Sequence, residues 1–419
     1  MIVKRKTLIT VLLLVFTAII GMALNLTVTY KACVFCLMII CILRGKAERY
    51  FLNPYYMFIL VPFTLLIYTK MSKYHLKLTD NTYIIAIINI VTFIMAMDLT
   101  PEYKHFERCK GVGEGRQVTI NAIILLGLGF LPTVYFIIVG HSMPLASVIS
   151  LFSTGAVLCA LKSKKKKLII FVSLCFILSW VKYVSKSAIL TFSIAMIIGF
   201  EKYYVRSIEQ KRKLVALSVV GVVLMIFAFS FANQGRSNAY GRDALDYYTK
   251  YGGVKWKGNA LLFMPYMYLT TPWTNLQYVM ETQPTHTYGL WAIKPLLNYL
   301  QIDGIFSDYY VLQPYSNFNT FTFIACCFKD FGFWGSCISS AFLGIFTKKI
   351  YSRYKVSKSP LDVTCYVLLS QAVLEMFFSN HFYTQSYPFT IVIIMGIYKM
   401  VFCKKYQPEL EQMYIDDMK

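Results

Sequence analysis

Residues 118–140 read VTINAIILLGLGFLPTVYFIIVG, a run of 23 residues without a charged side chain. An α-helix rises about 1.5 Å per residue, so this run is long enough to cross the roughly 30 Å hydrocarbon core of a bilayer. Comparable apolar runs recur along the 419 residues, of which 57% are hydrophobic and 15% are charged. The sequence therefore predicts an integral membrane protein that crosses the bilayer many times.

The predicted spans are helices, because backbone polar groups in lipid must be satisfied within the segment itself. Twelve spans are expected near residues 7–28, 31–43, 53–69, 82–98, 118–140, 144–161, 168–184, 187–201, 214–232, 321–347, 361–379 and 386–403. Residues 259–280 are a candidate half-span or interfacial helix. The expected fold is an all-α, polytopic transmembrane bundle, with residues 1–419 as a single membrane domain.

The basic residues predict the orientation of the spans. The net charge is +22, but the Lys and Arg residues gather in short clusters between apolar runs, as in KSKKKK at 162–167 and QKRK at 210–213. Cytoplasmic loops of membrane proteins carry such an excess of basic residues. With the N-terminus inside and alternating sides, most of the 42 Lys and Arg residues lie on the inner side. We therefore expect both termini in the cytoplasm and no nucleic-acid partner.

The segment 233–320 is the longest polar stretch, and the same alternation places it outside. Its 88 residues include 18 aromatic, six basic and five acidic side chains, and none of the 11 cysteines. Long loops of this kind in membrane proteins are usually functional or folded. We expect a small helical cap on the outer surface.

Basic residues on the outer side require an explanation. Lys186, Arg236 and Arg242 lie close to predicted span ends on that side. A pyrophosphate carried by a lipid would explain them, since basic side chains form strong charge-assisted hydrogen bonds with phosphate oxygens. The alternative is a solvated face, or contact with anionic lipid headgroups.

The outer segment and the span ends also carry candidate sugar-binding and acid–base residues. Asp330 and His381 lie at the outer water boundary, where either could accept a proton from a sugar hydroxyl. The structural alternatives are an ion pair or helix N-cap for Asp330 and an interfacial hydrogen bond for His381. Aromatic rings stack on sugars, although an interfacial aromatic belt is the alternative for each ring. The candidate rings are Tyr247, Tyr248, Trp273 and Tyr315.

Nucleotide and metal chemistry are not indicated. The sequence contains no GxxxxGK[ST] phosphate-binding loop, no HExxH pair and no cluster of metal-ligand residues. We expect neither a nucleotide-driven pump nor a sugar-nucleotide glycosyltransferase, and we expect no cofactor and no metal.

The block NFNTFTFIACCFKDFGFWGSCISSAFLGIFTKKIY at 317–351 resembles the late signature of the O-antigen or oligosaccharide repeat-unit polymerases (Wzy-type). The matching residues are Asn319, Thr320, Asp330, Phe331, Gly332 and Gly335. Residues 266–300 are similar to the outer-loop segment of that family, and VKYVSKSAIL at 181–190 is similar to its Gly-Ser-Arg-Ser turn. In that turn Val184 replaces glycine and Lys186 replaces arginine, which keeps the charge but loses the bidentate fork.

The resemblance implies a membrane-embedded, GT-C-like glycosyltransferase that is inverting and independent of metal. Its donor would be a growing glycan on undecaprenyl pyrophosphate, and its acceptor the next lipid-linked repeat unit. Reaction at the outer face of a bacterial inner membrane, and a chain-length regulator as a further partner, are also implied. On this expectation His381 or Asp330 is the base, Lys186, Arg236 and Arg242 bind pyrophosphate, and Asn319 joins the aromatic residues in binding glycan.

Two other functions remain open. An O-antigen ligase would share the architecture and differ in its acceptor. A polysaccharide flippase or secondary transporter would be non-enzymatic, and such proteins often contain internal repeats and helices broken at the midplane. The sequence predicts neither a repeat nor a broken helix.

Overall fold

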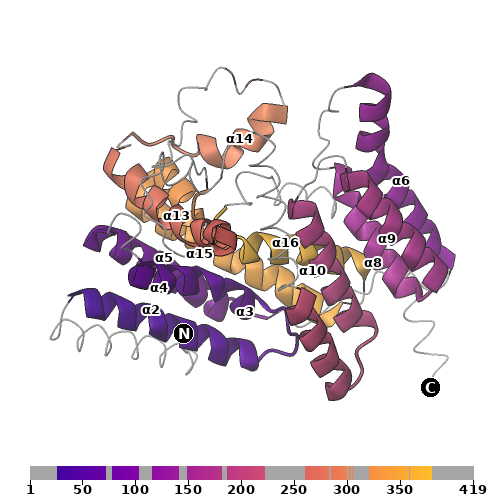
Figure 1. Ribbon diagram of the computed structural model, residues 1–419, viewed down its shortest axis with the longest axis horizontal. Coiled ribbons are helices and arrows are strands. Elements are labelled where there is room, and N and C mark those ends of the chain that lie inside the picture. The colour runs from indigo at the N-terminus through magenta and orange to yellow at the C-terminus, as the bar shows by residue number, and fades with distance from the viewer. Residues whose placement is uncertain are drawn as a thin grey trace, which may run out of the picture. The chain divides into compact units, whose positions relative to one another are not determined.

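The computed structural model describes residues 26–71, 78–102, 116–140, 149–181, 186–221, 260–282, 285–299, 302, 304, 320–357 and 359–379. Within these ranges every regular element is a helix (Figure 1). The chain divides into two compact units. Unit 1 comprises Met1–Glu102, Tyr204–Ser352 and Leu368–Tyr387, and unit 2 comprises Tyr103–Tyr203, Arg353–Val367 and Pro388–Lys419.

The helices fall where the apolar runs predict them. Unit 1 holds α2 (Leu26–Lys46), α3 (Pro54–Phe58), α4 (Leu60–Met71), α5 (Asp80–Leu99), α13 (Ala260–Thr282), α14 (Leu290–Tyr299) and most of α15 (Phe323–Val356). Unit 2 holds α6 (Arg116–Val139), α8 (Phe152–Ser163), α9 (Lys166–Val181) and α10 (Lys186–Tyr203). Residues of α16 (Pro360–Leu374) belong to both units.

The all-helical prediction is confirmed for these residues. Three helical stretches are long and apolar enough to cross a membrane: Val28–Lys46, Asp80–Leu99 and Val118–Val139. Pro54–Tyr68 and Pro360–Leu374 are shorter apolar stretches. The full count of twelve spans and the GT-C-like class stay predictions.

The span expected at 53–69 begins at a capped helix end. Asn53 is buried, and its side-chain oxygen accepts hydrogen bonds from the backbone N–H groups of Tyr55 and Tyr56, each at 3.1 Å. Its amide nitrogen donates to the carbonyl oxygens of Gly45 and Tyr50 at 3.2 and 3.0 Å. An N-cap side chain satisfies backbone donors that a helix start leaves open. Asn53 therefore fixes the turn between α2 and α3.

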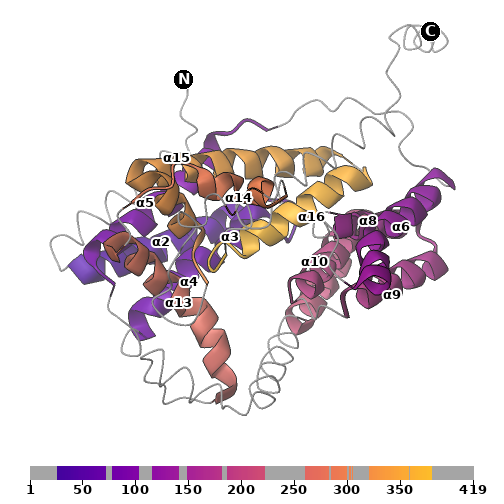
Figure 2. The ribbon, with the colours of Figure 1, turned by 90° about the horizontal axis from the view of Figure 1, so that it is seen from above.

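The core of unit 1 is aromatic. α2 packs against α3, α4 and α5, and α13 packs against α4 (Figures 1 and 2). The ring centroids of Phe58 and Phe93 lie 4.1 Å apart, and Phe323 of α15 meets both rings edge-on at 6.2 and 6.4 Å. Such pairs stabilise a core beyond the area they bury. This cluster joins α15 to the N-terminal helices.

Small and polar residues of α15 face α5. Asn89 donates to Ser336 Oγ at 3.1 Å and accepts from Ser340 Oγ at 2.6 Å, and all three side chains are fully buried. One turn further, a Cβ on Gly344 would lie 2.5 Å from the carbonyl oxygen of Phe93. Small residues four apart, joined by interhelical hydrogen bonds, are typical of helix pairs packed in membranes.

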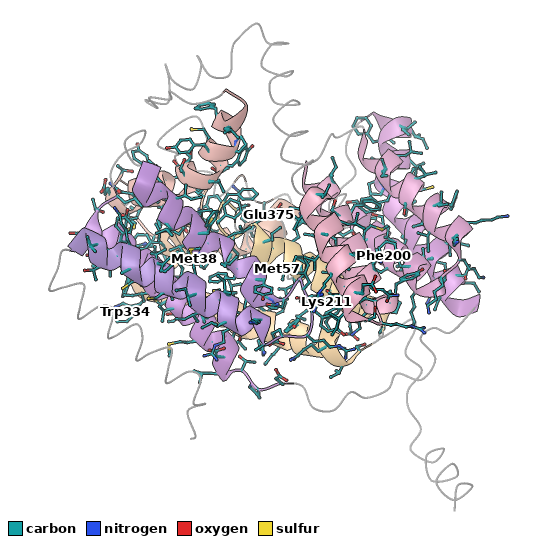
Figure 3. All side chains as sticks on the ribbon, turned by 60° about the horizontal axis from the view of Figure 1, so that its bottom comes forward. Met38, Met57, Phe200, Lys211, Trp334 and Glu375 are labelled. Atoms are coloured by element: carbon teal, nitrogen blue, oxygen red, sulfur yellow. The ribbon has the colours of Figure 1, made fainter. Side chains whose placement is uncertain are left out.

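The opposite face of α15 is apolar and exposed. Trp334 is 75% exposed, Ile338 70% and Phe342 63%, whereas Ser336 and Ser340 are fully buried. Figure 3 shows Trp334 at the rim of the helices and Met57 among them. A water-soluble helix has the reverse arrangement, with its apolar stripe toward the core. Exposed apolar surface of this extent marks contact with lipid or with another protein.

One end of unit 1 carries a network of charged residues. The Lys348 ammonium lies 3.2 Å from a carboxylate oxygen of Glu48 and 3.2 Å from one of Glu102. Next to it, Arg44 pairs with Asp98 at 3.0 Å. Topology predicted from charge places residues 44–52, 99–117 and 348–358 on the same, cytoplasmic side. The ion pairs of Lys348 join residues from all three segments.

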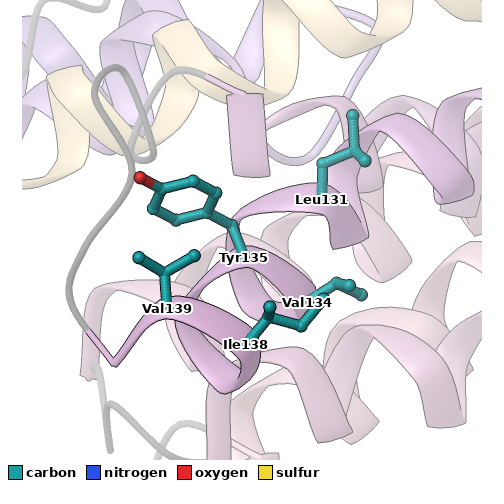
Figure 4. A pocket seen from close by; sticks show the side chains of 5 residues that line it. All are labelled: Leu131, Val134, Tyr135, Ile138 and Val139. Carbon is teal, nitrogen blue, oxygen red and sulfur yellow. The ribbon is translucent and has the colours of Figure 1, made fainter.

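Unit 2 exposes apolar surface too. α8 packs closely against α6, where a Cβ on Gly129 would lie 2.6 Å from the backbone nitrogen of Ser153. On α6, Leu131, Val134, Tyr135, Ile138 and Val139 line an open hollow (Figure 4). Ile138 in this hollow is 77% exposed. A surface of this composition is suited to acyl chains rather than to water.

Candidate functional site

Helix α15 is broken near its N-terminal end. Gly332 has φ 66° and ψ −158°, which is not helical and which residues with a side chain rarely adopt. A Cβ at this position would lie 3.0 Å from Nε2 of His286. Glycine therefore serves here both for its backbone conformation and for the close approach of the histidine ring. This break was not predicted from the sequence, and whether any helix breaks at the midplane of a membrane stays untested.

The segment that leads into α14 donates hydrogen bonds to the carbonyl groups at the break. A helix end leaves its last four carbonyl groups without intrahelical donors. The backbone N–H of Thr287 donates to the carbonyl oxygen of Lys329 at 3.0 Å, and that of Tyr288 donates to the carbonyl oxygen of Asp330 at 2.9 Å. These bonds attach the outer segment directly to the interrupted turn of α15.

The Asp330 carboxylate caps α14. One carboxylate oxygen accepts from the Thr287 hydroxyl at 2.5 Å and from the backbone N–H of Trp291 at 3.0 Å. The other accepts from the backbone N–H of Ala292 at 3.0 Å. Asp330 is fully buried, and a carboxylate at a helix N-terminus is stabilised by the helix dipole. The geometry thus matches the N-cap alternative, and a base role for Asp330 stays a prediction.

Two further polar groups gather beside this cap. Lys329 is only 5% exposed, and its ammonium donates to the Thr285 hydroxyl at 3.4 Å. Nδ1 of His286 is buried and has no hydrogen-bond partner among the described residues. The His286 ring meets the rings of Phe328 and Tyr288 edge-on, with centroids 6.1 and 6.4 Å apart. A buried ammonium and a buried imidazole nitrogen therefore lie near the N-terminal end of α15.

α14 also presents an aromatic and cationic surface. The Lys294 ammonium lies 4.5 Å from the ring centroid of Trp291. Such cation–π contacts stabilise a lysine over an aromatic face. Lys294 is one of the six basic residues of the 233–320 segment, and its charge is here held close to the capped end of the helix.

The start of α15 is held by two other segments. Asn275 of α13 donates to the carbonyl oxygen of Thr320 at 2.7 Å. The backbone N–H groups of Phe321 and Phe323 donate to the carbonyl oxygens of Phe378 and Met376 at 3.1 and 2.9 Å. The chain that follows α16 therefore runs alongside the start of α15, and His381 follows Phe378 by three residues in the sequence.

Most of the predicted site residues fall outside the described ranges. These are Arg236, Arg242, Tyr247, Tyr248, Tyr315, Asn319 and His381. Lys186 is the first residue of α10, and its side chain is likewise outside the description. Their roles stay predictions.

Trp273 is a correction. It is fully buried in unit 1, and its indole N–H donates to the Thr64 hydroxyl of α4 at 3.1 Å. The hydroxyl of the neighbouring Thr274 is hydrogen-bonded to the hydroxyl of Tyr68, also in α4, at 3.0 Å. A ring enclosed in this way has no face for a sugar, so Trp273 anchors α13 to α4 instead of binding glycan.

His286, Thr285 and Lys329 are the residues that sequence reasoning missed. The histidine lies 43 residues before Lys329 in the sequence. The one signal was the PTHTYG segment at 284–289, whose polar residues and glycine suggest a turn ahead of a helix.

No group of three His, Cys, Asp or Glu side chains suited to a metal ion occurs among the described residues. Comparison with protein-family models, with curated proteins and with solved structures returned no match.

Proposed function

We propose that this chain is a bacterial inner-membrane polymerase of lipid-linked oligosaccharide repeat units. It transfers the growing glycan from undecaprenyl pyrophosphate to the next lipid-linked unit on the outer face. The observation that supports the proposal is the arrangement at α15. This helix exposes an apolar face suited to lipid, and it breaks beneath a helix of the predicted outer segment, where the buried Lys329 and the half-buried His286 lie.

The chemistry needs no nucleotide. The lipid pyrophosphate is itself an activated leaving group, and cationic side chains stabilise the charge that develops as it departs. A base removes the proton from the acceptor hydroxyl. Because the Asp330 carboxylate already accepts three hydrogen bonds, we assign it the role of a positioning residue and keep His381 as the proposed base.

The topology of unit 1 supports reaction at the outer face. The ion pairs of Lys348 gather segments that are predicted to be cytoplasmic. Along α15, Asp330 lies 18 residues before Lys348, which corresponds to about 27 Å of helix, close to the thickness of a bilayer core. The Asp330 cap would then lie near the opposite membrane surface.

The break in α15 is the observation that favours a transporter. In such proteins the unwound backbone coordinates ions or substrate. Here the carbonyl groups of Lys329 and Asp330 accept hydrogen bonds from Thr287 and Tyr288. That bonding supports a docked cap more than an ion site, and a ligase would share it.

Deletion of the gene tests the three functions against one another. Loss of a polymerase leaves glycan chains of a single repeat unit. Loss of a ligase leaves long chains that are not transferred, and loss of a flippase leaves repeat units on the inner leaflet. Wild-type chain lengths in the deletion strain would rule the polymerase out. Formation of long chains by the purified protein in proteoliposomes, from lipid-linked repeat units alone, would establish it.

A further inference from the structure

The Lys329 side chain is a buried cation that has no ionic partner in the part of the chain that the structure describes. It is 5% exposed, its ammonium has a single long hydrogen bond to the Thr285 hydroxyl, and no carboxylate among the described residues forms an ion pair with it. Burying an unpaired charge is costly, and such groups are normally neutralised or paired. Lys348 on the same helix shows the usual solution, with two glutamates at 3.2 Å.

The histidine next to Thr285 has an open hydrogen-bonding atom as well. Nδ1 of His286 is buried and has no partner among the residues that the structure describes, while its Nε2 edge approaches Gly332. An imidazole nitrogen can donate a hydrogen bond when it carries the proton. The Thr285 hydroxyl lies 3.4 Å from the Lys329 ammonium, His286 is the next residue in the chain, and each of the three side chains can donate a hydrogen bond.

The nearest carboxylate does not serve as that acceptor. Asp330 follows Lys329 in the chain, but both of its oxygens accept hydrogen bonds from Thr287 and the start of α14. Its charge is offset there by the helix dipole.

We infer that Thr285, His286 and Lys329 form a binding site for a phosphate-class oxyanion. Phosphate oxygens accept several hydrogen bonds at once and pair strongly with ammonium groups. The inference deepens the proposed function and rests on it in naming the diphosphate headgroup of a polyprenyl lipid as the natural source. Inorganic pyrophosphate is the other source of the same chemistry.

The test uses the full-length protein in nanodiscs of phosphatidylethanolamine and phosphatidylglycerol. Binding of undecaprenyl pyrophosphate, of inorganic pyrophosphate and of undecaprenol is measured through the ligand-induced rise in Tm. We expect the wild-type protein to bind the diphosphate lipid and not the alcohol. Lys329→Met, which keeps the chain length and removes the charge, should weaken binding roughly tenfold to hundredfold.

Two variants control for folding and for net charge. Lys329→Arg retains the cation and should keep most of the affinity. Lys213→Met removes the same charge at an exposed position, 72% accessible and paired with Glu209, and should bind like the wild type. Equal affinity of Lys329→Met and wild type for both pyrophosphate probes would overturn the site. Binding of inorganic pyrophosphate as tight as that of the lipid would make a soluble anion the ligand.

The outcome is separable from that of the proposed function. If the deletion strain makes long chains while Lys329-dependent pyrophosphate binding persists, the polymerase assignment fails and the oxyanion site stands. If polymerisation depends on the gene while Lys329→Met binds the lipid normally, the polymerase stands and the site fails.

Discussion

The Asp330 carboxylate accepts the Thr287 hydroxyl at 2.5 Å, although the two residues are 43 positions apart in the chain. The same carboxylate accepts two backbone N–H groups at the start of α14. An Asp-Phe-Gly triplet on a predicted membrane helix invites a catalytic interpretation, but this geometry describes a cap supplied by a distant residue. The cap determines where α14 lies over α15.

Removing this cap should loosen α14 without eliminating the reaction. Asp330→Ala leaves two backbone donors without acceptors, which typically costs about 1–2 kcal/mol. We expect a lower Tm, faster proteolysis after α14 and shortened glycan chains. Asp330→Asn keeps one acceptor oxygen and should restore part of the Tm, of the resistance to proteolysis and of the glycan chain length. Glycan chain lengths and proteolysis rates, measured on the same variants, distinguish a capping role from a base role. Complete inactivity of Asp330→Asn in a stably folded protein would return Asp330 to the role of base.

Gly332→Ala should be among the most destabilising changes of a glycine in this chain. The positive φ is unfavourable for alanine by roughly 1–2 kcal/mol, and the new methyl group would press on His286. Gly127→Ala is the matched control, because no atom lies within 4 Å of a Cβ at that helical position. That control should be neutral or stabilising by up to about 1 kcal/mol. Thermal unfolding in nanodiscs measures both, and equal Tm values would contradict the prediction.

The Asn89 network should stabilise the pairing of α5 with α15. Ser340→Val removes the donor to Asn89 Oδ1 and leaves a buried amide oxygen unsatisfied, at a cost of about 1–3 kcal/mol. Ser339→Val on the same helix changes a partly buried neighbour and serves as the control. Denaturant titration of the two variants compares them. Interhelical hydrogen bonds in membranes are sometimes worth less than 1 kcal/mol, and a loss of that size for Ser340→Val would show that packing, not the network, holds the pair.

The two ends of unit 1 should label from opposite sides of the membrane. In a background without native cysteines, Thr285→Cys should react with an impermeant maleimide added to intact spheroplasts. Lys46→Cys, at the end of α2, should react only after the membrane is opened. Reaction of Lys46→Cys in intact cells would contradict the predicted topology, and the proposed site would then not lie on the outer face.

Lys348 should be strongly coupled to its glutamates. Lys348→Met leaves Glu48 and Glu102 without their cation, and breaking a buried ion pair on one side typically costs about 3–5 kcal/mol. Adding Glu48→Gln should recover part of the loss, which a double-mutant cycle on Tm or denaturant midpoints detects. Additive effects of the two substitutions would mean that the pair contributes little.

The longest helices could be predicted because their apolar runs are long and carry few charges, as at Asp80–Leu99 and Val118–Val139. The break at Gly332 could not be predicted, because a glycine within an apolar helix has several uses. The hydrogen bond that satisfies the interrupted turn comes from the backbone of Tyr288. Trp273 was misjudged for a related reason. Aromatic content suggested a sugar-binding surface, but the hydroxyl of Thr64, more than 200 residues away, gives its indole N–H a buried partner.

The candidate site, too, could be predicted from the sequence only in part. Asp330 was found from its sequence context, with its capping role as one alternative, because a charge in an apolar segment is visible in the sequence. His286 was missed, because its proximity to Gly332 arises only when α14 docks.

The bonds that join the outer segment to α15 come from the main chain of Thr287 and Tyr288. Main-chain donors are the same whatever side chain is attached, so position 288 can vary widely among descendants of this protein without loosening that attachment. The exceptions are proline, which has no N–H to donate, and β-branched residues, which are strained at the positive φ of 49° that Tyr288 adopts. Substitutions at position 288 could therefore replace the exposed ring of Tyr288, and so change which molecules contact this surface, while the main-chain attachment to α15 is kept.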